Sequence, residues 1–419
     1  MKTVDLVYFN AGGGHRASAL ALQEQLEAER RPWQVRLVNL FEVLDPKGSF
    51  RQWAGFDPEE VYNRRLARGW TIGLGQELKL LQGLIRLGHT TLCRTLQQHW
   101  LGSEPDLVVS LVPNFNRAIG ESLASTLPGV PFVTVMTDMA DLPPSFWIEP
   151  GVPQHLVCGT AHAAAQALAA GVAPARIVRS SGMLIRPAFY APVPHDRAAE
   201  RRALGLDPDR PTGVVMFGGQ GSAQMARIAA LLPQVQLIHL CGHNAALVTR
   251  LGAMRRAAPQ AAIGFTREVP RWMALGDFFI GKPGPGCLSE ALHMGLPVIT
   301  FDNAWTMPQE RYNARWVREQ GVGLVLRSVK VLPAAVASLV ADLARFRQRV
   351  SELDNRAIEE VPVVLAQLLD GSDEAAPASG AGWGSAIGAG TGADGAAAPA
   401  GTRTGLASAL RSMISSRPS

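Results

Sequence analysis

The sequence predicts an α/β fold of two doubly wound, Rossmann-like domains that face a cleft, followed by a disordered C-terminal tail. Segments with strand and helix patterns alternate along the chain, which is typical of a parallel sheet wound with helices. The order of strand, glycine loop and helix begins twice. A chain of 419 residues is also too long for one ordinary hydrophobic core, so two domains are expected.

The first domain is predicted over residues 1–186. The β-branched run "VDLVYFN" ends at the glycine loop "AGGGH", and "RASALALQEQLEAERR" follows with leucines at helical spacing. Later strands are expected at "VRLVNLF", "DLVVSLV", "PFVTVMTD" and "HLVCGT", with helices at "NRAIGESLAS" and "AHAAAQALAAG". These units form one doubly wound domain.

The second domain repeats this pattern after a linker. Residues 187–211 are rich in Pro, Asp and Arg and predict a linker with one short helix. "TGVVMFGGQGS" opens a domain over residues 212–335, with later strands at "VQLIHLCG", "DFFIGK", "LPVITF" and "GVGLVL". Helices over 336–370 have no strand after them, so they close this domain or pack back on the first. Residues 371–419 are mostly small or Pro and cannot bury enough apolar surface to offset ordering entropy.

Composition narrows the class of protein. The amino-acid content, 47% hydrophobic and 18% charged, is that of a globular enzyme. The cysteines are widely spaced and form no C-x-x-C pair, and no His cluster has ligand spacing, so neither a disulfide framework nor a zinc site is indicated. The N-terminus lacks the apolar core of a cleavable signal, and no stretch reaches the roughly 20 apolar residues of a membrane span. We therefore expect a cytoplasmic protein. A net charge of +5 suits anionic partners but is also common in housekeeping enzymes.

The long connection between about residues 45 and 105 has two interpretations. It mixes Leu and Ile with basic side chains and Trp, a combination that suits a membrane interface. The alternative is a set of ordinary helices whose apolar stripe faces the core. The residues concerned are Arg64, Arg65, Arg68, Trp70, Lys79, Arg86, Arg94 and Trp100.

Two glycine loops occupy equivalent places in the two halves. "AGGGHRA" and "FGGQGSA" each follow a strand, leave room for a ligand near the backbone, and turn helix-start N–H groups outward. Either loop alone could mark only a tight turn. Two such loops at strand ends of facing domains predict a ligand cleft.

The stretch "GKPGPGCLSEALHMGLPVITFDN" at 281–303 completes that cleft. Its small residues let phosphate oxygens reach the N–H groups of a helix starting near Gly286 or Cys287. Glu290, expected in the first turn, would accept hydrogen bonds from two ribose hydroxyls, which together with the diphosphate indicates a nucleoside diphosphate. The alternative is that Glu290 only complements the helix dipole.

These segments resemble a known family. "GGGH", "GGQGS", "RWMALGDFFIGKPGPGCLSEALHMGLPVI" and "PQERYNA" are similar to glycosyltransferases that make monogalactosyldiacylglycerol or processively glucosylate diacylglycerol. They resemble more distantly the bacterial enzyme that adds N-acetylglucosamine to lipid-linked muramyl-pentapeptide. The resemblance covers about residues 4–330 and is most specific over 265–313. It implies the glycosyltransferase-B (GT-B) fold, a UDP-sugar donor in the second domain and a lipid acceptor reached from the first.

The resemblance also implies roles for particular residues. It places uracil near the backbone of Phe265 and Thr266, and it implies that Asn313 supports the loop that carries Gln309 and Glu310. Glu290 becomes the ribose ligand, Gln309 and Glu310 hold the donor sugar, and His15 matches a proposed base or phosphate partner. Gly13 and Gly14 are expected to bind the donor, and the residues expected near its diphosphate are Gly218, Gly219, Gln220, Gly221, Ser222, Pro285 and Gly286.

The chain departs from the family pattern on the acceptor side. Val112 stands before Pro113 where family members commonly have His, and "TDMADLPPSFW" lacks the usual His and sets Trp147 one position later. Asp138 and Asp141 of that segment could hold or deprotonate the acceptor hydroxyl, or could be turn residues.

The reaction implied is inverting transfer of a hexose from a UDP-sugar to a lipid hydroxyl such as that of diacylglycerol. Helix N–H groups would stabilise the leaving UDP, so no metal or other cofactor is expected. The expected partners are the UDP-sugar, a lipid acceptor and an anionic membrane surface, and no nucleic acid is expected. The protein is expected to associate with the inner face of the cell membrane. Two alternatives remain: a UDP-sugar epimerase of the same fold, and a non-catalytic UDP-sugar-binding protein.

Overall fold

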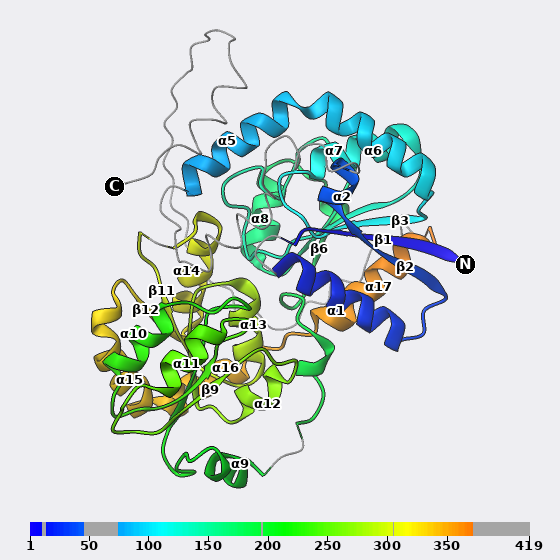
Figure 1. The fold of residues 1–419 in the computed structure, drawn as a ribbon. Coiled ribbons are helices and arrows are strands. Elements are labelled where there is room, and N and C mark those ends of the chain that lie inside the picture. The colour runs from blue at the N-terminus through cyan, green and yellow to red at the C-terminus, as the bar shows by residue number, and fades with distance from the viewer. Residues whose placement is uncertain (11–13, 46–73, 194–195, 305, 372–419) are drawn as a thin grey trace. The chain divides into compact units, whose positions relative to one another are not determined.

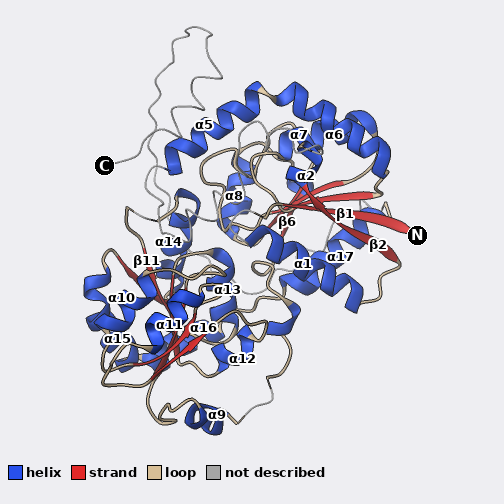
Figure 2. Ribbon diagram, viewed as in Figure 1, coloured by secondary structure: helices blue, strands red, loops and turns tan. Residues whose placement is uncertain are grey.

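Two parallel sheets organise the protein. The computed structural model describes residues 1–10, 14–45, 74–193, 196–304 and 306–371. Within these ranges the chain forms two sheets of six strands each, and all strand pairs are parallel (Figure 1). Helices lie on both sides of the sheets (Figure 2). The predicted α/β fold with two Rossmann-like halves is therefore confirmed.

The first sheet has the strand order β2-β1-β3-β4-β5-β6. Leu6 of the interior strand β1, next to the edge strand β2, points to one face of the sheet and Val7 to the other, and both are fully buried. A strand that is apolar on both sides is expected where helices cover both faces of a parallel sheet. The strands are β1 (Lys2–Tyr8), β2 (Trp33–Asn39), β3 (Leu107–Ser110), β4 (Phe132–Val135), β5 (His155–Cys158) and β6 (Ile177–Arg179).

Helices cover both faces of the first sheet. α1 (Gly14–Ala28) and α17 (Ala357–Leu369) pack on the face that Leu6 shares. α6 (His89–Ser103) and α7 (Asn116–Thr126) pack on the opposite face with Val7. The other helices of this half are α2 (Leu40–Leu44), α5 (Leu74–Leu87) and α8 (Ala161–Ala169).

The second sheet has the order β12-β11-β10-β7-β8-β9. Its strands are β7 (Thr212–Met216), β8 (Gln236–Leu240), β9 (Gln260–Ile263), β10 (Phe278–Gly281), β11 (Val298–Phe301) and β12 (Gly323–Leu326). One face packs against α12 (Val269–Ala274), α13 (Pro285–His293) and α14 (Arg311–Gln320). The other face packs against α10 (Gln224–Leu231), α11 (Ala245–Gly252), α15 (Leu332–Ala341) and α16 (Leu343–Ser351).

The last helices divide between the two sheets. α15 belongs to the core of the second sheet, whereas α17 contacts α1 and shares the core of the first (Figure 1). Both alternatives raised for residues 336–370 are therefore realised, each by a different helix. The short helix expected in the linker is α9 (Arg197–Ala203). The predicted tail, 371–419, lies outside the described residues from position 372 onward.

A charged cluster fixes the linker to the second half. Asp277, just before β10, accepts hydrogen bonds from Arg197 and Arg201 of α9 at 2.7 and 2.6 Å and from Arg347 of α16 at 2.6 Å. These contacts hold the pKa of Asp277 below its ordinary value despite burial.

Among the described residues, no helix is both long and apolar enough to span a bilayer.

Candidate active site

The loop after β7 has the open form expected of a phosphate-binding turn. Gly218 and Gly221 have positive φ angles of 82° and 60°, a backbone conformation that favours glycine. A Cβ on Gly221 would lie 2.6 Å from the Cys241 carbonyl oxygen, so the β8 end packs directly beneath this loop. Gly219 has open space where a side chain would project, and its carbonyl accepts a hydrogen bond from the His243 N–H at 2.8 Å. Ligand atoms can therefore approach this backbone closely.

The helix after β10 presents uncapped N–H groups. α13 begins at Pro285, whose fixed φ and missing N–H suit the first helical position. No side chain caps this end, and Gly286 has open space around it. The Gly218 backbone lies close enough to the Cys287 thiol to oppose the rise in its pKa that burial causes, which places the two loops side by side. Together they present backbone N–H groups suited to an anion at the carboxyl ends of β7 and β10.

Glu290 lies one turn deeper than expected. α13 has no acidic residue in its first turn, because the helix begins at Pro285 and Glu290 is its sixth residue. The expectation that Glu290 sits in the first turn is wrong, and the dipole alternative loses its geometric basis since that effect fades beyond the first turn. Burial raises the pKa of Glu290 to about 7, and the charge of Arg186 opposes this only in part. Among the described residues no donor hydrogen-bonds this carboxylate, so it remains available to a ligand.

A buried ion pair adjoins these loops. Lys282 follows β10, and its Nζ lies 2.8 Å from Oε1 of Glu310, which is largely buried. The Lys282 side chain runs past Gly218 and Gly284, whose added Cβ atoms would lie 3.8 and 3.0 Å from its Cε. Lysine charge is thereby placed beside the proposed diphosphate position. Lys282 lies in the 281–303 stretch, but its sequence pattern predicted no role for this residue.

The neighbours of Glu310 support the same loop. Gln309 is half-buried in the 3-10 turn Pro308–Glu310 and contacts the Met307 sulfur at 4.0 Å. Asn313 is fully buried and donates to the Pro283 carbonyl at 2.8 Å, so it holds the turn before α13. Its Oδ1 is buried and finds no partner among the described atoms.

His15 occupies the first turn of α1. Its Nδ1 lies 2.9 Å from Oγ1 of Thr137, and its ring centroid lies 5.8 Å from that of Trp147. Burial lowers the pKa of His15 to about 4, although a hydrogen bond with the Leu111 backbone favours the protonated form. The imidazole is therefore neutral near pH 7 and can accept a proton. Gly14 begins α1, whereas Gly13 lies outside the described residues.

Asp138 and Asp141 occupy different environments. Oδ2 of Asp138 accepts a hydrogen bond from the Trp147 indole at 3.0 Å. Burial raises the pKa of Asp138 to about 7, with a further increase from Glu310 and opposing effects of Trp147 and Lys282. This carboxyl group therefore titrates near neutrality, close to the Lys282–Glu310 pair.

The Asp141 carboxylate instead braces a turn. It accepts backbone hydrogen bonds from Ser145, Phe146 and Trp147 at 3.0, 2.9 and 2.6 Å. A fourth contact comes from the Ile148 N–H at 3.4 Å. With these donors around it, Asp141 matches the turn-residue alternative better than the catalytic one.

The residues expected near uracil lie on an exposed platform. Phe265 is 59% exposed, and its ring stacks on His243 with centroids 4.0 Å apart and an interplanar angle of 18°. The Thr266 hydroxyl accepts a hydrogen bond from the Glu268 N–H at 3.0 Å. Gln220 is exposed on the neighbouring loop, and Ser222 accepts from the Gln224 N–H at 3.2 Å. An exposed aromatic ring beside the glycine loop is a suitable surface for a nucleobase.

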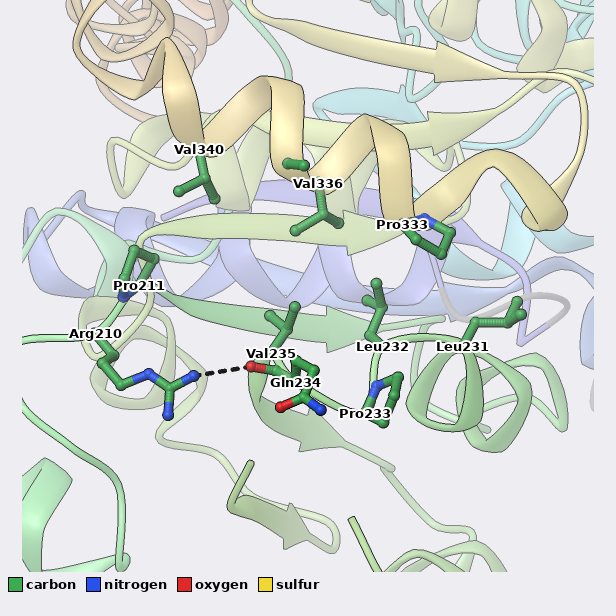
Figure 3. A pocket seen from close by; sticks show the side chains of 11 residues that line it. Arg210, Pro211, Leu231, Leu232, Pro233, Gln234, Val235, Pro333, Val336 and Val340 are labelled. Atoms are coloured by element: carbon green, nitrogen blue, oxygen red, sulfur yellow. Dashed lines mark hydrogen bonds between the residues drawn. The ribbon is translucent and has the colours of Figure 1, made fainter. Parts of the chain in front are cut away.

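A separate pocket lies at the opposite ends of the strands. It has a volume of about 350 Å³ and is lined by residues that precede β7 and β8 and by one side of α15 (Figure 3). Arg210 at its edge donates to the Gln234 carbonyl at 3.0 Å. Because ligands of open α/β sheets bind at the carboxyl ends of strands, this apolar pocket is not the site assembled above.

The two six-stranded parallel sheets define a protein with the GT-B fold. The structure resembles MurG of Acinetobacter baumannii with a TM-score of 0.56 and 14% identity, covering 88% of this chain and all of that one. It also resembles the glycosyltransferase SnogD of Streptomyces nogalater, with a TM-score of 0.51, 17% identity and coverage of 88% and 100%. At these identities the likeness concerns the fold alone.

Sequence relatives identify the family. Residues 214–368 match the glycosyltransferase family 28 C-terminal domain. A rice protein (Oryza sativa subsp. indica) described as a probable monogalactosyldiacylglycerol synthase 2 is 30% identical over 354 residues, covering 80% of this chain and 73% of the relative. Monogalactosyldiacylglycerol synthase 1 of Arabidopsis thaliana is 28% identical over 359 residues, covering 81% and 64%. The chain belongs to the monogalactosyldiacylglycerol synthase family and is a glycosyltransferase, which confirms the predicted resemblance.

Proposed function

We propose that this protein transfers a hexose from a UDP-sugar, with inversion, to the hydroxyl group of a lipid such as diacylglycerol. Its relatives are named for the synthesis of monogalactosyldiacylglycerol, which motivates galactose as the first sugar to test. The observation that carries the proposal is the convergence of the 218–222 loop, the open α13 start and Lys282 at one edge of the second sheet.

The donor would bind across this edge. Backbone N–H groups of the glycine loop and of α13 would receive the diphosphate, and Lys282 would add a positive charge. Glu290 would accept hydrogen bonds from the ribose hydroxyls, and the Phe265 ring would support the uracil. Gln309 and Glu310 would contact the hydroxyls of the sugar. The pairing of Glu310 with Lys282 would then link sugar recognition to the diphosphate.

The chemical step would need a base and a stabilised leaving group. In this proposal neutral His15 takes the proton of the acceptor hydroxyl while that oxygen attacks the anomeric carbon opposite the departing UDP. A bound diphosphate would raise the pKa of His15 toward the working pH, because a nearby anion favours the imidazolium ion. Asp138, when ionised, would accept a hydrogen bond from the same hydroxyl and orient it.

Amide dipoles and Lys282 would stabilise the charge that develops on UDP. Preorganised donors of this kind supply the role that a divalent metal has in other transferases, so we propose transfer without a metal cofactor. The acid–base groups and the UDP-binding groups come from different halves of the chain. Donor binding and proton removal can therefore be separated by mutation.

An acceptor with lipid tails implies a membrane surface. α5 and α6 expose Leu80, Leu81, Leu87 and Leu101, and the exposed fractions of the last two are 73% and 63%. Lys79 and Arg86 lie on the same helix as the first three. Apolar and basic side chains on one exposed segment suit the surface of an anionic bilayer. We therefore propose peripheral binding at the cytoplasmic face of the membrane.

Vesicle sedimentation tests the membrane proposal. The protein should sediment with anionic vesicles at low salt and be released as salt rises. Replacing Leu80, Leu81 and Leu87 together with Ser should reduce sedimentation while leaving UDP affinity unchanged. Arg64, Arg65 and Arg68 lie outside the described residues, and their joint replacement with Gln tests the charge contribution separately. Sedimentation that neither set of substitutions changes would contradict a membrane role for this segment.

Product analysis separates transfer from its rivals. The protein is incubated with labelled UDP-galactose, UDP-glucose or UDP-N-acetylglucosamine, with and without diacylglycerol vesicles, and products are identified by mass spectrometry. A transferase makes labelled glycolipid only when lipid is present. An epimerase converts the UDP-sugar without lipid, and a binding protein leaves the donor unchanged. Either of the last two results would overturn the proposal.

A further inference from the structure

Three metal-ligating side chains meet between α6 and α7, on residues to which the transfer reaction assigns no role. His89 is the first residue of α6, Cys93 follows one turn later on the same face, and Glu121 reaches them from α7. Nε2 of His89 lies 2.6 Å from Oε2 of Glu121 and 3.5 Å from Sγ of Cys93. One ligand atom from each residue lies within 4.8 Å of the other two.

We propose that His89, Cys93 and Glu121 bind one divalent cation of the zinc type. An imidazole nitrogen, a thiolate and a carboxylate form a mixed ligand set that suits borderline-soft ions such as Zn²⁺ or Co²⁺ rather than Mg²⁺ or Ca²⁺. Three protein ligands leave a fourth position for water. The required rearrangement is small, because the ligand atoms need only separate to the spacing around a tetrahedral ion of about 2.0–2.3 Å bond length.

The local structure lets an ion reach the site from solvent and supplies negative charge to neutralise it. The side chains of His89 and Glu121 are 24% and 41% exposed, so an ion can enter from solvent. On binding, Cys93 releases its thiol proton to solvent, and neutral His89 binds the ion through Nε2 while its hydrogen stays on Nδ1. The two negative charges of the thiolate and carboxylate then neutralise the ion. Arg117 contacts the other carboxylate oxygen of Glu121 at 2.8 Å and can continue to orient it.

A bound metal ion would fix the connection between α5 and α6. Gly88 alone separates α5 from α6, and His89 stands directly after it. A metal ion bound by α6 and α7 would anchor the start of α6, and with it the α5–α6 connection, to α7. The site would stabilise the packing of α6 on α7, and it is independent of the metal-free sugar transfer proposed above.

Cobalt spectroscopy on the purified full-length chain tests the site. Co²⁺ added to metal-stripped, reduced protein should give one equivalent of a tetrahedral complex, with visible d–d bands and a thiolate-to-cobalt charge-transfer band. Excess Zn²⁺ should displace it. Saturating Zn²⁺ should also raise the unfolding temperature, because an ion that binds only the folded state stabilises it. The absence of a thiolate band in the wild-type protein would overturn the proposal.

Matched variants locate the ligands. Cys93→Ser should abolish the charge-transfer band, and Glu121→Gln should weaken Co²⁺ binding by at least about tenfold, since even outer contacts of metal ligands contribute 10–100-fold. Gln98→Ala, an exposed change elsewhere on α6, should have no effect. Circular dichroism confirms that each variant folds, and if Cys93→Ser does not, Glu121→Gln decides. An unchanged band in Cys93→Ser would assign binding to another cysteine and overturn the site.

Discussion

Lys282 and Glu310 form a largely buried ion pair, with Nζ and Oε1 2.8 Å apart, between the end of β10 and the turn before α14. Their charges also act in opposite directions on the pKa of Asp138. The pair in the second half therefore contributes to the electrostatic environment of a carboxyl group of the first half. It is the clearest structural element of the candidate site that the sequence did not predict.

Breaking this pair should separate stability from activity. Lys282→Met leaves Glu310 buried without that partner, which should reduce the free energy of unfolding by about 1–3 kcal/mol, less than for a fully buried pair because lysine is partly exposed. The double variant Lys282→Met/Glu310→Gln should regain most of that loss in thermal unfolding but remain poorly active with UDP-sugar. A double variant that recovers activity as well would show that the pair is only structural.

Replacing His15 should affect turnover rather than donor binding. His15→Ala should lower kcat by roughly 10²–10⁴ if the imidazole is the general base, and UDP affinity measured by calorimetry should hardly change. In the free protein burial lowers the pKa of His15 to about 4, so the imidazole is neutral before the donor binds at every pH from 5 to 8. Turnover within a few-fold of wild type would transfer the base role to Asp138.

The titration of Asp138 should appear in the pH profile. Its pKa of about 7 means that the ionised form, which orients the acceptor, is gained as pH rises, so kcat/KM should increase between pH 6 and 8. Asp138→Asn keeps an oxygen for the Trp147 indole and should give a flat profile with about tenfold lower activity.

Asp141→Asn serves as the matched control for Asp138. Since Asp141 binds backbone N–H groups of the 145–148 turn, its replacement should lower the unfolding temperature and leave the pH profile of the folded enzyme unchanged. A profile that keeps its step near pH 7 in Asp138→Asn, or loses it in Asp141→Asn, would contradict these assignments.

Glu290 should discriminate between ribose and deoxyribose. Hydrogen bonds to a charged group contribute about 1.5–3 kcal/mol each, so Glu290→Ala should weaken UDP binding at least about tenfold. Calorimetric titration should show wild type preferring UDP over 2′-deoxy-UDP and the variant losing that preference. Equal binding of both compounds to wild type would remove Glu290 from ribose recognition.

Glu290 should also make the thermal stability of the protein depend on pH. Burial raises the pKa of Glu290 from 4.5 to about 7 in the folded protein. The protonated carboxyl group therefore contributes fully to the free energy of unfolding below about pH 4.5, and this contribution is lost as the pH rises through about 7. Glu290→Gln cannot ionise. The variant should therefore unfold at a higher temperature than wild type at pH 8 and show no such advantage at pH 4. An equal difference at both pH values would indicate an effect unrelated to this titration.

The sequence predicted the parts of the site that depend on local pattern. The two strand, glycine-loop and helix units are local patterns, and the structure reproduces both sheets. The start of α13 was placed one or two residues late, because Pro285 takes the first helical position and so moves Glu290 into the second turn. Of the segment between about residues 45 and 105, much lies outside the described residues, and Trp100 is fully buried on α6, as the core alternative predicts.

Contacts between distant residues were not predictable from one sequence. Lys282 meets Glu310 across 28 positions, and α17 returns to the first sheet through contacts with α1. His89 and Cys93 lie four residues apart on one helix, but the third side chain of the cluster, Glu121, comes from α7. The sequence pattern therefore did not predict a metal site there. The role of Asp141 depends on a turn whose backbone N–H groups converge on one carboxylate.

The most direct test of the proposed function is the anomeric configuration of the product. UDP-galactose, an α-linked donor labelled at C1, is incubated with the protein and diacylglycerol vesicles, and the lipid fraction is analysed by NMR spectroscopy. Inverting transfer predicts a β-linked galactolipid that requires lipid, His15 and no added metal. A product with α linkage, an isomerised UDP-sugar formed without lipid, or an unchanged donor for every sugar and lipid tested would contradict it.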